Sequence, residues 1–392
     1  MILRKINLIN FRNIKKLQLS FDKKINILIG DNAQGKTNIL ESIYFLALTK
    51  SYRTNDFNLI NKDESFTKIK AELKDNNVYK NLSVEIKDEI KKVKINNNEV
   101  SKISDYITNL NVILVCPEDI NILQGTPAER RNFLNIELSQ LSKNYIKKYN
   151  EFNKILKIRN NYLKMLYNSS NPDTRYLDSL TENLIEREID IYQERNNFIN
   201  LINENVSNIY EDILGIKNFH IEYETNIDFD NFETEHLKDR ISKKYKQSLR
   251  KEIDNGMTLY GPHRDDLRFM IGEDDIKLYG SQGQQKVAII ALKLSEISIF
   301  RNLIKSSPII LLDDVFSELD VKTRNKLIKY IDDDIQVVIT TNDTRGINRK
   351  FLETAKIFKV VKGNIIEKVG SNNAKWKLWF IFNTSIRRIR GR

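Results

Sequence analysis

Hydrophobic and polar positions near the start of the chain predict three strands and a helix. Apolar and polar residues alternate in Ile2–Leu8 and in Leu17–Phe21, and the mostly apolar run Ile25–Ile29 follows. Alternation with a period of two predicts half-buried strands, and a short apolar run predicts a buried one. The stretch Asn38–Leu48 has helix-forming residues and a mostly apolar body, so we expect strand, loop and helix in succession.

The pattern changes twice further along the chain. Residues 67–115 predict short strands joined by Asn-rich turns, which extend a sheet. From about Pro127 to Leu214 apolar residues recur at helical spacing, which predicts a helical insertion. The turn-forming cluster 168–173 should reverse this insertion and leave helices of roughly 30 to 40 residues on either side. From about residue 256 to Lys368 we expect loops, a helix after Ser281 and further buried strands.

Composition narrows the class of protein. The 392 residues carry a formal charge of +11, which attracts polyanions, with nucleic acid ahead of an anionic membrane surface. An AT-rich genome explains the abundance of lysine equally well. The single cysteine, Cys116, cannot form an internal disulfide, so a reducing compartment, the cytoplasm, is expected. No apolar run is long enough to span a bilayer, and no membrane span is expected.

A glycine-rich loop lies between the third predicted strand and the helix. Backbone N–H groups of such a loop, at the positive end of a helix dipole, wrap phosphates. Lys36 would bridge the β and γ phosphates of a nucleotide, and Thr37 would bind Mg²⁺. A chance match in an ordinary turn is the alternative, and the flanking strand and helix argue against it. The expected ATP-binding residues are Gly30, Asp31, Asn32, Ala33, Gln34, Gly35, Lys36 and Thr37.

Two carboxylates, Asp313 and Asp314, follow the apolar run Ile309–Leu312. Asp313 lies 277 positions after Lys36. Such a run predicts a central strand that delivers acids beside the loop. Asp313 would hold Mg²⁺ through water, and Asp314 would orient or deprotonate the attacking water. A strand-end turn with Asp as a helix cap is the plainer interpretation. The separation predicts a nucleotide-binding unit assembled from both ends of the chain.

A third motif, Ser281-Gln282-Gly283, precedes a predicted helix. It could present a hydroxyl and free backbone N–H groups to an anion. By itself this is only a capped helix. The glycine loop, this motif, the acid pair and Ser317–Asp320 occur in the same order in ABC-type ATPases, which this chain therefore resembles.

Within that superfamily the chain resembles the RecF family of bacterial recombination proteins, relatives of the structural-maintenance-of-chromosomes proteins. The resemblance covers about residues 1 to 368. It rests on the segments 38–41, 50–54, 116–119, 125–127 with 130–131, 261–267 and 282–285. It implies an α/β fold: an ABC-type ATPase head built from both termini, with an inserted helical arm. The expected domains are 1–126 and 256–369 for the head halves, 127–255 for the arm and 370–392 for an atypical basic and aromatic tail.

The resemblance also implies a function. The family forms an ATP-dependent dimer in which Ser281 of one subunit would close on the γ-phosphate held by Lys36 of the other. It binds gapped or junction DNA, helps RecO and RecR load RecA, and takes part in replication restart and SOS induction. Slow, DNA-dependent ATP hydrolysis would release the dimer.

Three departures from the wider ABC pattern favour slow turnover. Asp314 stands where transporters carry Glu, and no Gln falls near Pro117-Glu118. The segment Ile339-Thr340-Thr341-Asn342 stands where transporters place a His. Two other functions stay open. A nuclease with an ABC head would need a further acidic metal cluster, and a scaffold would bind ATP without cleaving it.

Several basic residues have two interpretations. For Arg53, Arg130 and Arg131, phosphate contact competes with ion pairing, and for His263 and Arg264 contact with nucleotide or DNA competes with pairing to the adjacent aspartates. The tail 370–392 carries both tryptophans among basic residues. It could stack on single-stranded bases or lie on a membrane surface, or it is an extension without such a role.

Overall fold

The computed structural model describes residues 1–76, 78–168, 173–331 and 334–369. Contacts divide the chain into two compact units. The first contains Met1–Pro117 and the chain from Ser306 onward, and the second is Glu118–Lys305. Most of the predicted turn cluster (169–172) and the whole predicted tail (370–392) lie outside the described residues.

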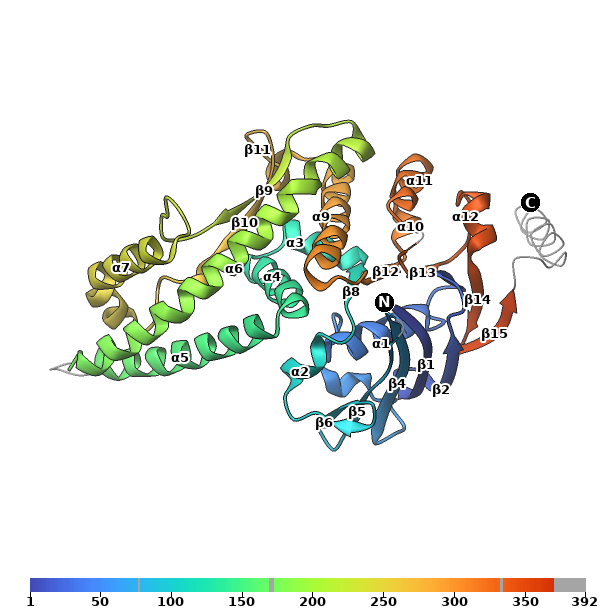
Figure 1. Ribbon diagram of the computed structural model, residues 1–392, viewed down its shortest axis with the longest axis horizontal. Coiled ribbons are helices and arrows are strands. Elements are labelled where there is room, and N and C mark those ends of the chain that lie inside the picture. Colours follow the sequence, from blue (N-terminus) through green and yellow to red (C-terminus); the bar gives the residue numbers. More distant parts are fainter. Residues whose placement is uncertain (77, 169–172, 332–333, 370–392) are drawn as a thin grey trace, which may run out of the picture. The chain divides into compact units, whose positions relative to one another are not determined.

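One six-stranded sheet of the first unit interleaves strands from both ends of the chain, in the order β15-β14-β3-β13-β12-β8. β3 lies parallel to β13 on one side and to β14 on the other, so C-terminal strands hold the strand that precedes the glycine loop. Figure 1 shows the C-terminal strands β13 and β14 (orange and red) beside the N-terminal part of the chain (blue). The α/β head built from both termini is thereby confirmed. The strands are β3 (Ile25–Ile29), β8 (Val112–Val115), β12 (Ile309–Asp313), β13 (Val337–Thr341), β14 (Lys356–Val361) and β15 (Asn364–Val369).

A second sheet of this unit is antiparallel and has the order β2-β1-β4-β5-β6-β7. Ile69, Ala71 and Leu73 of β4 are buried while the intervening Lys70 and Glu72 are exposed, as expected for a sheet with one solvated face. The predicted strands are confirmed, although β4 and β5 are longer than expected. The strands are β1 (Ile2–Phe11), β2 (Ile14–Ser20), β4 (Phe66–Asp75), β5 (Val78–Lys87), β6 (Ile90–Ile95) and β7 (Asn98–Glu99).

The helix after the glycine loop, α1 (Lys36–Leu48), contacts strands of both sheets and is almost entirely buried, so it has no polar face. This explains its mostly apolar sequence. The other helices of the unit are short and connect strands. They are a 3-10 helix at Asp56–Leu59, α2 (Ile103–Ile107), α10 (Val315–Glu318), α11 (Val321–Lys329) and α12 (Arg349–Thr354).

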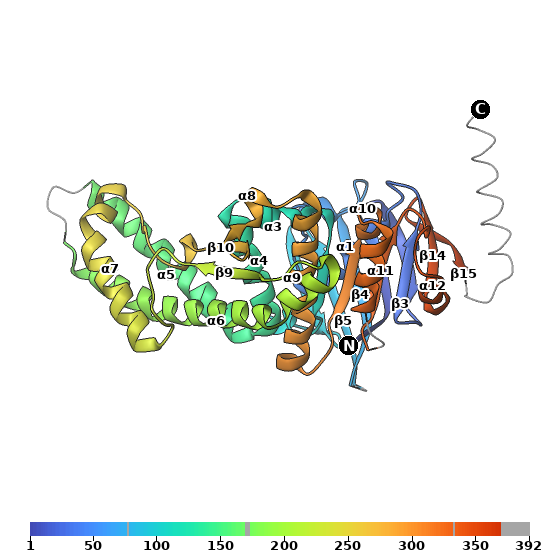
Figure 2. The same ribbon diagram turned by 90° about the horizontal axis from the view of Figure 1, so that it is seen from above.

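The second unit is mainly helical. α5 (Lys143–Tyr167) and α6 (Arg175–Leu214) pack along each other, and α9 (Gln282–Ile304) packs on α6 (Figure 2). A small sheet, β11-β10-β9, pairs residues 219–224 with 266–271. The remaining elements are α3 (Ile120–Gln124), α4 (Pro127–Leu141), β9 (Phe219–Glu224), α7 (Thr234–Asn255), a 3-10 helix at Pro262–Arg264, β10 (Asp266–Ile271), β11 (Asp274–Asp275) and α8 (Ile276–Tyr279); a further 3-10 helix, Pro117–Asp119, begins at the boundary between the units.

The helical insertion is confirmed, but one predicted helix length was wrong. α6 has 40 residues, whereas the segment before the turn cluster is divided into α4 with 15 residues and α5 with 25. The break lies at Ser142, which has an extended backbone and whose Oγ accepts the N–H of Tyr145. A serine in this conformation caps a new helix and does not continue the old one.

Contacts group residues 256–305 with the helical unit, because β10 pairs with β9 and α9 packs on α6. The division expected from the motifs, with boundaries at 126, 255 and 369, stays a prediction. Among the described residues, no helix is long and apolar enough to cross a membrane.

Candidate nucleotide-binding site

The glycine loop connects β3 to α1 and requires glycine at two positions. Gly35 has a φ of 99°, in the left-handed region that glycine adopts without steric cost. A Cβ on Gly30 would lie 2.5 Å from the carbonyl oxygen of Val360, which belongs to β14. Ala33 is also left-handed, with a φ of 61°. The loop therefore holds a tightly turned conformation.

Two turns from distant parts of the sequence hold this loop. In the turn between β14 and β15, the backbone N–H groups of Lys362 and Gly363 donate to Oε1 and to the carbonyl oxygen of Gln34, each at 2.8 Å. In the turn between β1 and β2, Oδ1 of Asn13 accepts Nδ2 of Asn38 at 2.8 Å. The loop and the first turn of α1 are thus held by segments near both ends of the chain.

Lys36 directs its ammonium group back into the loop. Nζ donates to the carbonyl oxygens of Gly30 at 2.7 Å and Asp31 at 2.9 Å, and to Oδ1 of Asn342 at 2.9 Å. Burial lowers the pKa of Lys36, although Asp314 and Asp313 act in the opposite direction. A partly desolvated cation at the start of a helix is suited to phosphate oxygens.

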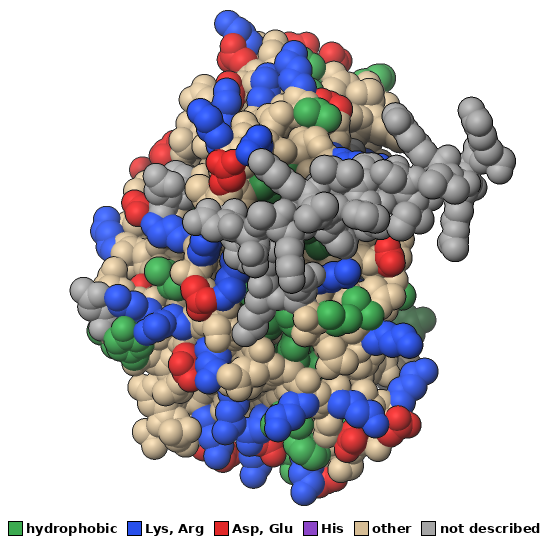
Figure 3. Space-filling model, turned by 90° about the vertical axis from the view of Figure 1, so that its right-hand side faces the viewer, with side chains coloured by type: hydrophobic (Ala, Val, Ile, Leu, Met, Phe, Trp, Pro, Cys, Tyr) green, Lys and Arg blue, Asp and Glu red, His purple; other side chains and the backbone are tan. Residues whose placement is uncertain are grey.

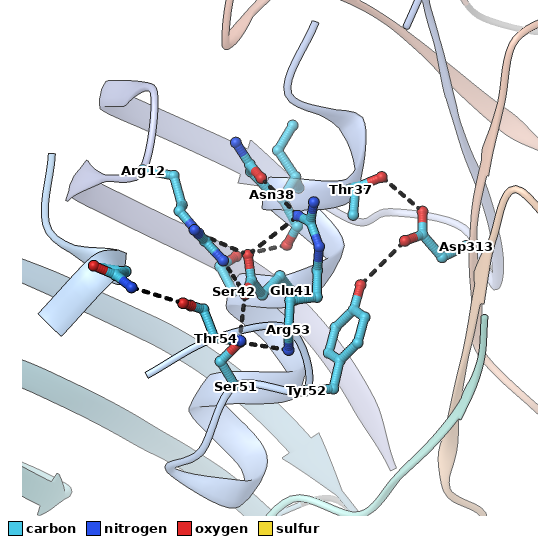
Figure 4. A network of polar contacts seen from close by, with 12 residues as sticks. Arg12, Thr37, Asn38, Glu41, Ser42, Ser51, Tyr52, Arg53, Thr54 and Asp313 are labelled. Carbon is cyan, nitrogen blue, oxygen red and sulfur yellow. Dashed lines mark hydrogen bonds and ion pairs between the residues drawn. The ribbon is translucent and has the colours of Figure 1, made fainter. Parts of the chain in front are cut away.

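Asp313 ends β12, and its carboxylate accepts hydrogen bonds from three hydroxyl groups. Two of them, those of Thr37 and Tyr52, are drawn in Figure 4. Oδ1 of Asp313 accepts hydrogen bonds from the hydroxyl groups of Thr37 at 2.9 Å and Thr340 at 2.6 Å. Its Oδ2 accepts one from the hydroxyl of Tyr52 at 3.1 Å. The predicted metal pair, Thr37 and Asp313, is therefore in direct contact. A hydroxyl and a carboxylate oxygen side by side are the donor types that Mg²⁺ prefers, and Mg²⁺ usually completes its shell with water and phosphate oxygens. The residues present fit that ion.

Asp314 follows in a left-handed conformation with a φ of 53°. Its backbone N–H donates to Oγ1 of Thr340 at 2.9 Å, and its carboxylate accepts the hydroxyl of Ser317. Backbone conformations of this kind are uncommon in non-glycine residues and persist where the surroundings impose them. The side chains of Asp313 and Asp314 therefore have different partners, Thr37 for the first and Ser317 for the second. The expected catalytic role of Asp314 stays a prediction.

A buried ion-pair cluster lies behind the loop. Glu41 of α1 has no exposed surface and binds Arg12 through two hydrogen bonds of 2.7 and 3.0 Å. Arg53 lies 3.6 Å from the same carboxylate, and Oγ of Ser51 donates to it at 2.5 Å (Figure 4). Glu41 thereby joins the turn after β1 and the segment after α1 to the nucleotide-binding helix.

The Ser281 motif lies in the second unit, at the start of α9. Ser281 is the N-cap residue, and with Gln284 it forms a capping box in which each side chain bonds the backbone N–H of the other residue. Gln282 and Gly283 occupy the exposed first turn. Backbone N–H groups of a first turn have no partner within the helix. Leu278 and Tyr279, just before the motif, are 70% and 75% exposed.

The basic residues with two interpretations are mostly engaged in unit-internal contacts. Arg130 is buried and its guanidinium binds Asp266, while Arg131 donates to the carbonyl oxygen of Asp265 at 2.7 Å.

His263 contacts the carbonyl oxygen of Thr258, and burial lowers its pKa to about 4. Asp265 itself accepts Arg195 and Tyr223. Pairing of His263 and Arg264 with the adjacent aspartates was therefore the wrong alternative; Arg264 contacts Sδ of Met257.

Sequence reasoning missed two side chains of the site. Tyr52 was noted only as part of a family motif, and nothing in the local pattern indicates that its hydroxyl reaches Asp313. Asn342 was noted only as part of the segment that replaces a His, yet it is the side chain that binds Lys36. Its position just after the buried strand β13 is the one signal that could have indicated it.

Comparisons with known proteins agree with this architecture. The family model of the RecF/RecN/SMC N-terminal domain matches residues 2–365. The DNA replication and repair proteins RecF of Bacillus thuringiensis (strain Al Hakam) and Bacillus cereus (strain B4264) are each 39% identical over 368 residues, which is 93% of this chain and 98% of theirs.

Solved structures are similar over the same length. The recombination mediator protein RecF with ATP, of the RecFOR pathway, has 29% identity and a TM-score of 0.85 over 94% of this chain and 97% of its own. An Smc head of Pyrococcus furiosus, at 16% identity and a TM-score of 0.52 over 97% of this chain and 99% of its own, shares the fold. The chain belongs to the RecF/RecN/SMC family and, within it, to the RecF proteins.

Proposed function

We propose that this protein is an ATP-dependent, DNA-binding ATPase of recombinational repair. One observation carries the proposal: Thr37 and Asp313, from opposite ends of the sequence, meet at 2.9 Å beside Lys36. This is the arrangement that binds a nucleoside triphosphate with Mg²⁺ in P-loop proteins. RecF relatives named for DNA replication and repair, and RecF structures with ATP, support it.

The residues of the site would divide the work as follows. The loop 30–37 would bind the phosphates through backbone N–H groups, and Lys36 would exchange its carbonyl contacts for phosphate oxygens. Thr37 and Asp313 would hold Mg²⁺, which neutralises phosphate charge when bound. Asp314 would orient the attacking water and accept its proton. Its short side chain and its bond to Ser317 favour slow hydrolysis.

The Ser281 motif would act on a second subunit. Its exposed first turn offers the hydroxyl of Ser281 and the N–H groups of Gln282 and Gly283 to an anion. In an ATP-bound homodimer, these groups of one subunit would close on the γ-phosphate held by Lys36 of the other. Two ATP molecules would then hold the dimer together, and hydrolysis would release it.

DNA is the proposed partner of the dimer. The net charge of +11 favours a polyanion, and the outward face of the antiparallel sheet carries Lys70, Lys92 and Lys94. Figure 3 shows one face of the molecule on which Lys and Arg side chains gather with fewer acids between them. By resemblance, the dimer acts in the bacterial cytoplasm at gapped or junction DNA, where it helps RecO and RecR load RecA during replication restart and SOS induction.

A scaffold that binds ATP without cleaving it is the second candidate, since Asp314 bonds Ser317 in this structure. Asp314→Asn separates the two. If Asp314 supports hydrolysis, the variant should lose phosphate release by about a hundredfold while ATP-dependent dimerisation on DNA persists or lengthens. Equal phosphate release by the variant and the wild type contradicts the assignment of Asp314. No detectable hydrolysis by the wild type favours the scaffold.

A further inference from the structure

Tyr52 contacts the metal-binding acid from a segment to which no role is assigned. It follows α1, and its hydroxyl donates to Oδ2 of Asp313 at 3.1 Å. Its ring packs edge-on against Tyr44, with ring centroids 5.2 Å apart. The phenol thus approaches Asp313 from α1's side of the site, with its ring fixed by a neighbour.

The three hydroxyl groups around Asp313 are not distributed evenly. Thr37 and Thr340 both donate to Oδ1, and Tyr52 donates to Oδ2. A carboxylate rotates about its last bond unless both oxygens are held. Tyr52 therefore holds the far oxygen and helps to keep Oδ1 directed at Thr37.

The backbone on both sides of Tyr52 is anchored to α1. Oγ of Ser51 donates to Glu41 at 2.5 Å and accepts the N–H of Arg53 at 3.0 Å. The guanidinium of Arg53 donates to Oδ1 of Asn38 at 3.2 Å and lies 3.6 Å from Glu41. Because Glu41 is fully buried, this anchor is rigid.

The phenol of Tyr52 can act only as a donor to Asp313. Burial, and then the charge of Asp313, raise the pKa of Tyr52 far above its usual range. Its contact with the carboxylate at 3.1 Å is a charge-assisted hydrogen bond.

We propose that Tyr52 is a positioning residue for Mg²⁺: its hydroxyl fixes Asp313 so that the carboxylate and Thr37 present their oxygens together. The proposal rests on the proposed function, because it assumes that this site binds ATP with Mg²⁺. Partners that orient metal ligands commonly change metal affinity by 10- to 100-fold when removed. Tyr52 should therefore influence metal dependence more than nucleotide affinity.

The test is the Mg²⁺ concentration that half-saturates binding of N-methylanthraniloyl-ATP, followed by fluorescence in the full-length protein. Tyr52→Phe removes only the hydroxyl and should raise this concentration by about tenfold, with metal-free nucleotide affinity in EDTA unchanged. Ser51→Ala, which keeps the phenol but loosens its segment, should raise it by about threefold. The matched control is Tyr106→Phe in the same unit, which removes a buried hydroxyl that has no hydrogen-bond partner among the described residues.

The outcomes separate the two proposals. A wild-type protein that binds the nucleotide equally with and without Mg²⁺ overturns both the proposed function and the role of Tyr52. A Mg²⁺-dependent wild type with the same half-saturation in Tyr52→Phe and Tyr106→Phe overturns the role of Tyr52 alone. A lower melting temperature in Tyr52→Phe without a change in Mg²⁺ dependence marks the contact as structural and also overturns it.

Discussion

Nζ of Lys36 lies 2.9 Å from Oδ1 of Asn342, although 306 positions separate the two residues. The same ammonium group contacts the carbonyl oxygens of Gly30 and Asp31. Asn342 follows β13, the strand between β3 and β12. A neutral acceptor at this place holds the ammonium without competing strongly with phosphate.

Asn342→Asp should weaken ATP binding by about tenfold, because a carboxylate pairs more strongly with the ammonium and repels the phosphates. Titration with a fluorescent ATP analogue measures the effect. Asn144→Asp, at an exposed position of α5, is the matched control and should leave the affinity unchanged. Equal affinities for the wild type and Asn342→Asp contradict this role.

Ser281→Arg should abolish ATP-dependent dimerisation and leave ATP binding by the monomer intact. Ser281 is exposed, so the larger side chain fits in the monomer, at a cost of about 1 kcal/mol for the lost helix cap. Nucleotide titration and sedimentation, run on the same sample, measure both properties. Loss of ATP binding in the isolated variant would show that the motif does not act on a second subunit.

His263 should make the protein lose stability as the pH falls. Its folded pKa of about 4 lies below the usual value of about 6.5, because the imidazole is buried. The unfolded chain therefore binds a proton that the folded chain does not, and stability is lost below about pH 6.5. Asp265 acts in the opposite direction: burial raises its pKa to about 6, so it favours folding as the pH falls through that value.

His263→Gln removes one of these two opposing effects. Between pH 7.5 and pH 5 the variant should gain about 2 kcal/mol in free energy of unfolding relative to the wild type. Chemical denaturation at the two pH values measures this difference, and any constant cost of the substitution cancels. His220→Gln, at a partly exposed histidine of the same unit, is the control. A difference that does not depend on pH would contradict a buried, neutral His263.

Lys293→Met should destabilise the second unit by about 3 to 5 kcal/mol. Lys293 is buried on α9, 2.9 Å from Glu137 and 3.6 Å from Glu296, and its loss leaves two buried acids without a cation. Adding Glu137→Gln should restore part of the loss. Lys147→Met, at an exposed lysine of α5, should change the unfolding free energy by less than about 0.5 kcal/mol. An equally small change in unfolding free energy in Lys293→Met would contradict a stabilising role for the buried ion pairs of Lys293.

The sequence indicated the parts of the fold that local patterns encode. The glycine loop is preceded by β3 and followed by α1, and the carboxyl ends of parallel strands meet at one edge, so the contact of Thr37 with Asp313 could be expected. The pairing of β1 with β4 could not be expected, because it joins residues about 60 to 70 positions apart and assigns β1 to a different sheet from β3. No local period carries that information.

The polar contacts of the site were less predictable still. Tyr52 reaches Asp313 only because Ser51 and Arg53 are fixed to Glu41, an arrangement of three segments that no single motif contains. Ser142 shows the same limit on a smaller scale, since one cap divides a helical pattern that looks continuous. Side-chain direction, and not element type, is what the sequence left open.

ATP should join two copies of this chain. Sedimentation velocity of the full-length protein with ATP, ADP or a non-hydrolysable ATP analogue, each with and without gapped DNA, tests it most directly. We expect the sedimenting mass to double with ATP and with the analogue, and to remain that of a monomer with ADP. The dimer should persist longest with the analogue on DNA. A mass that never doubles with ATP or the analogue contradicts the account.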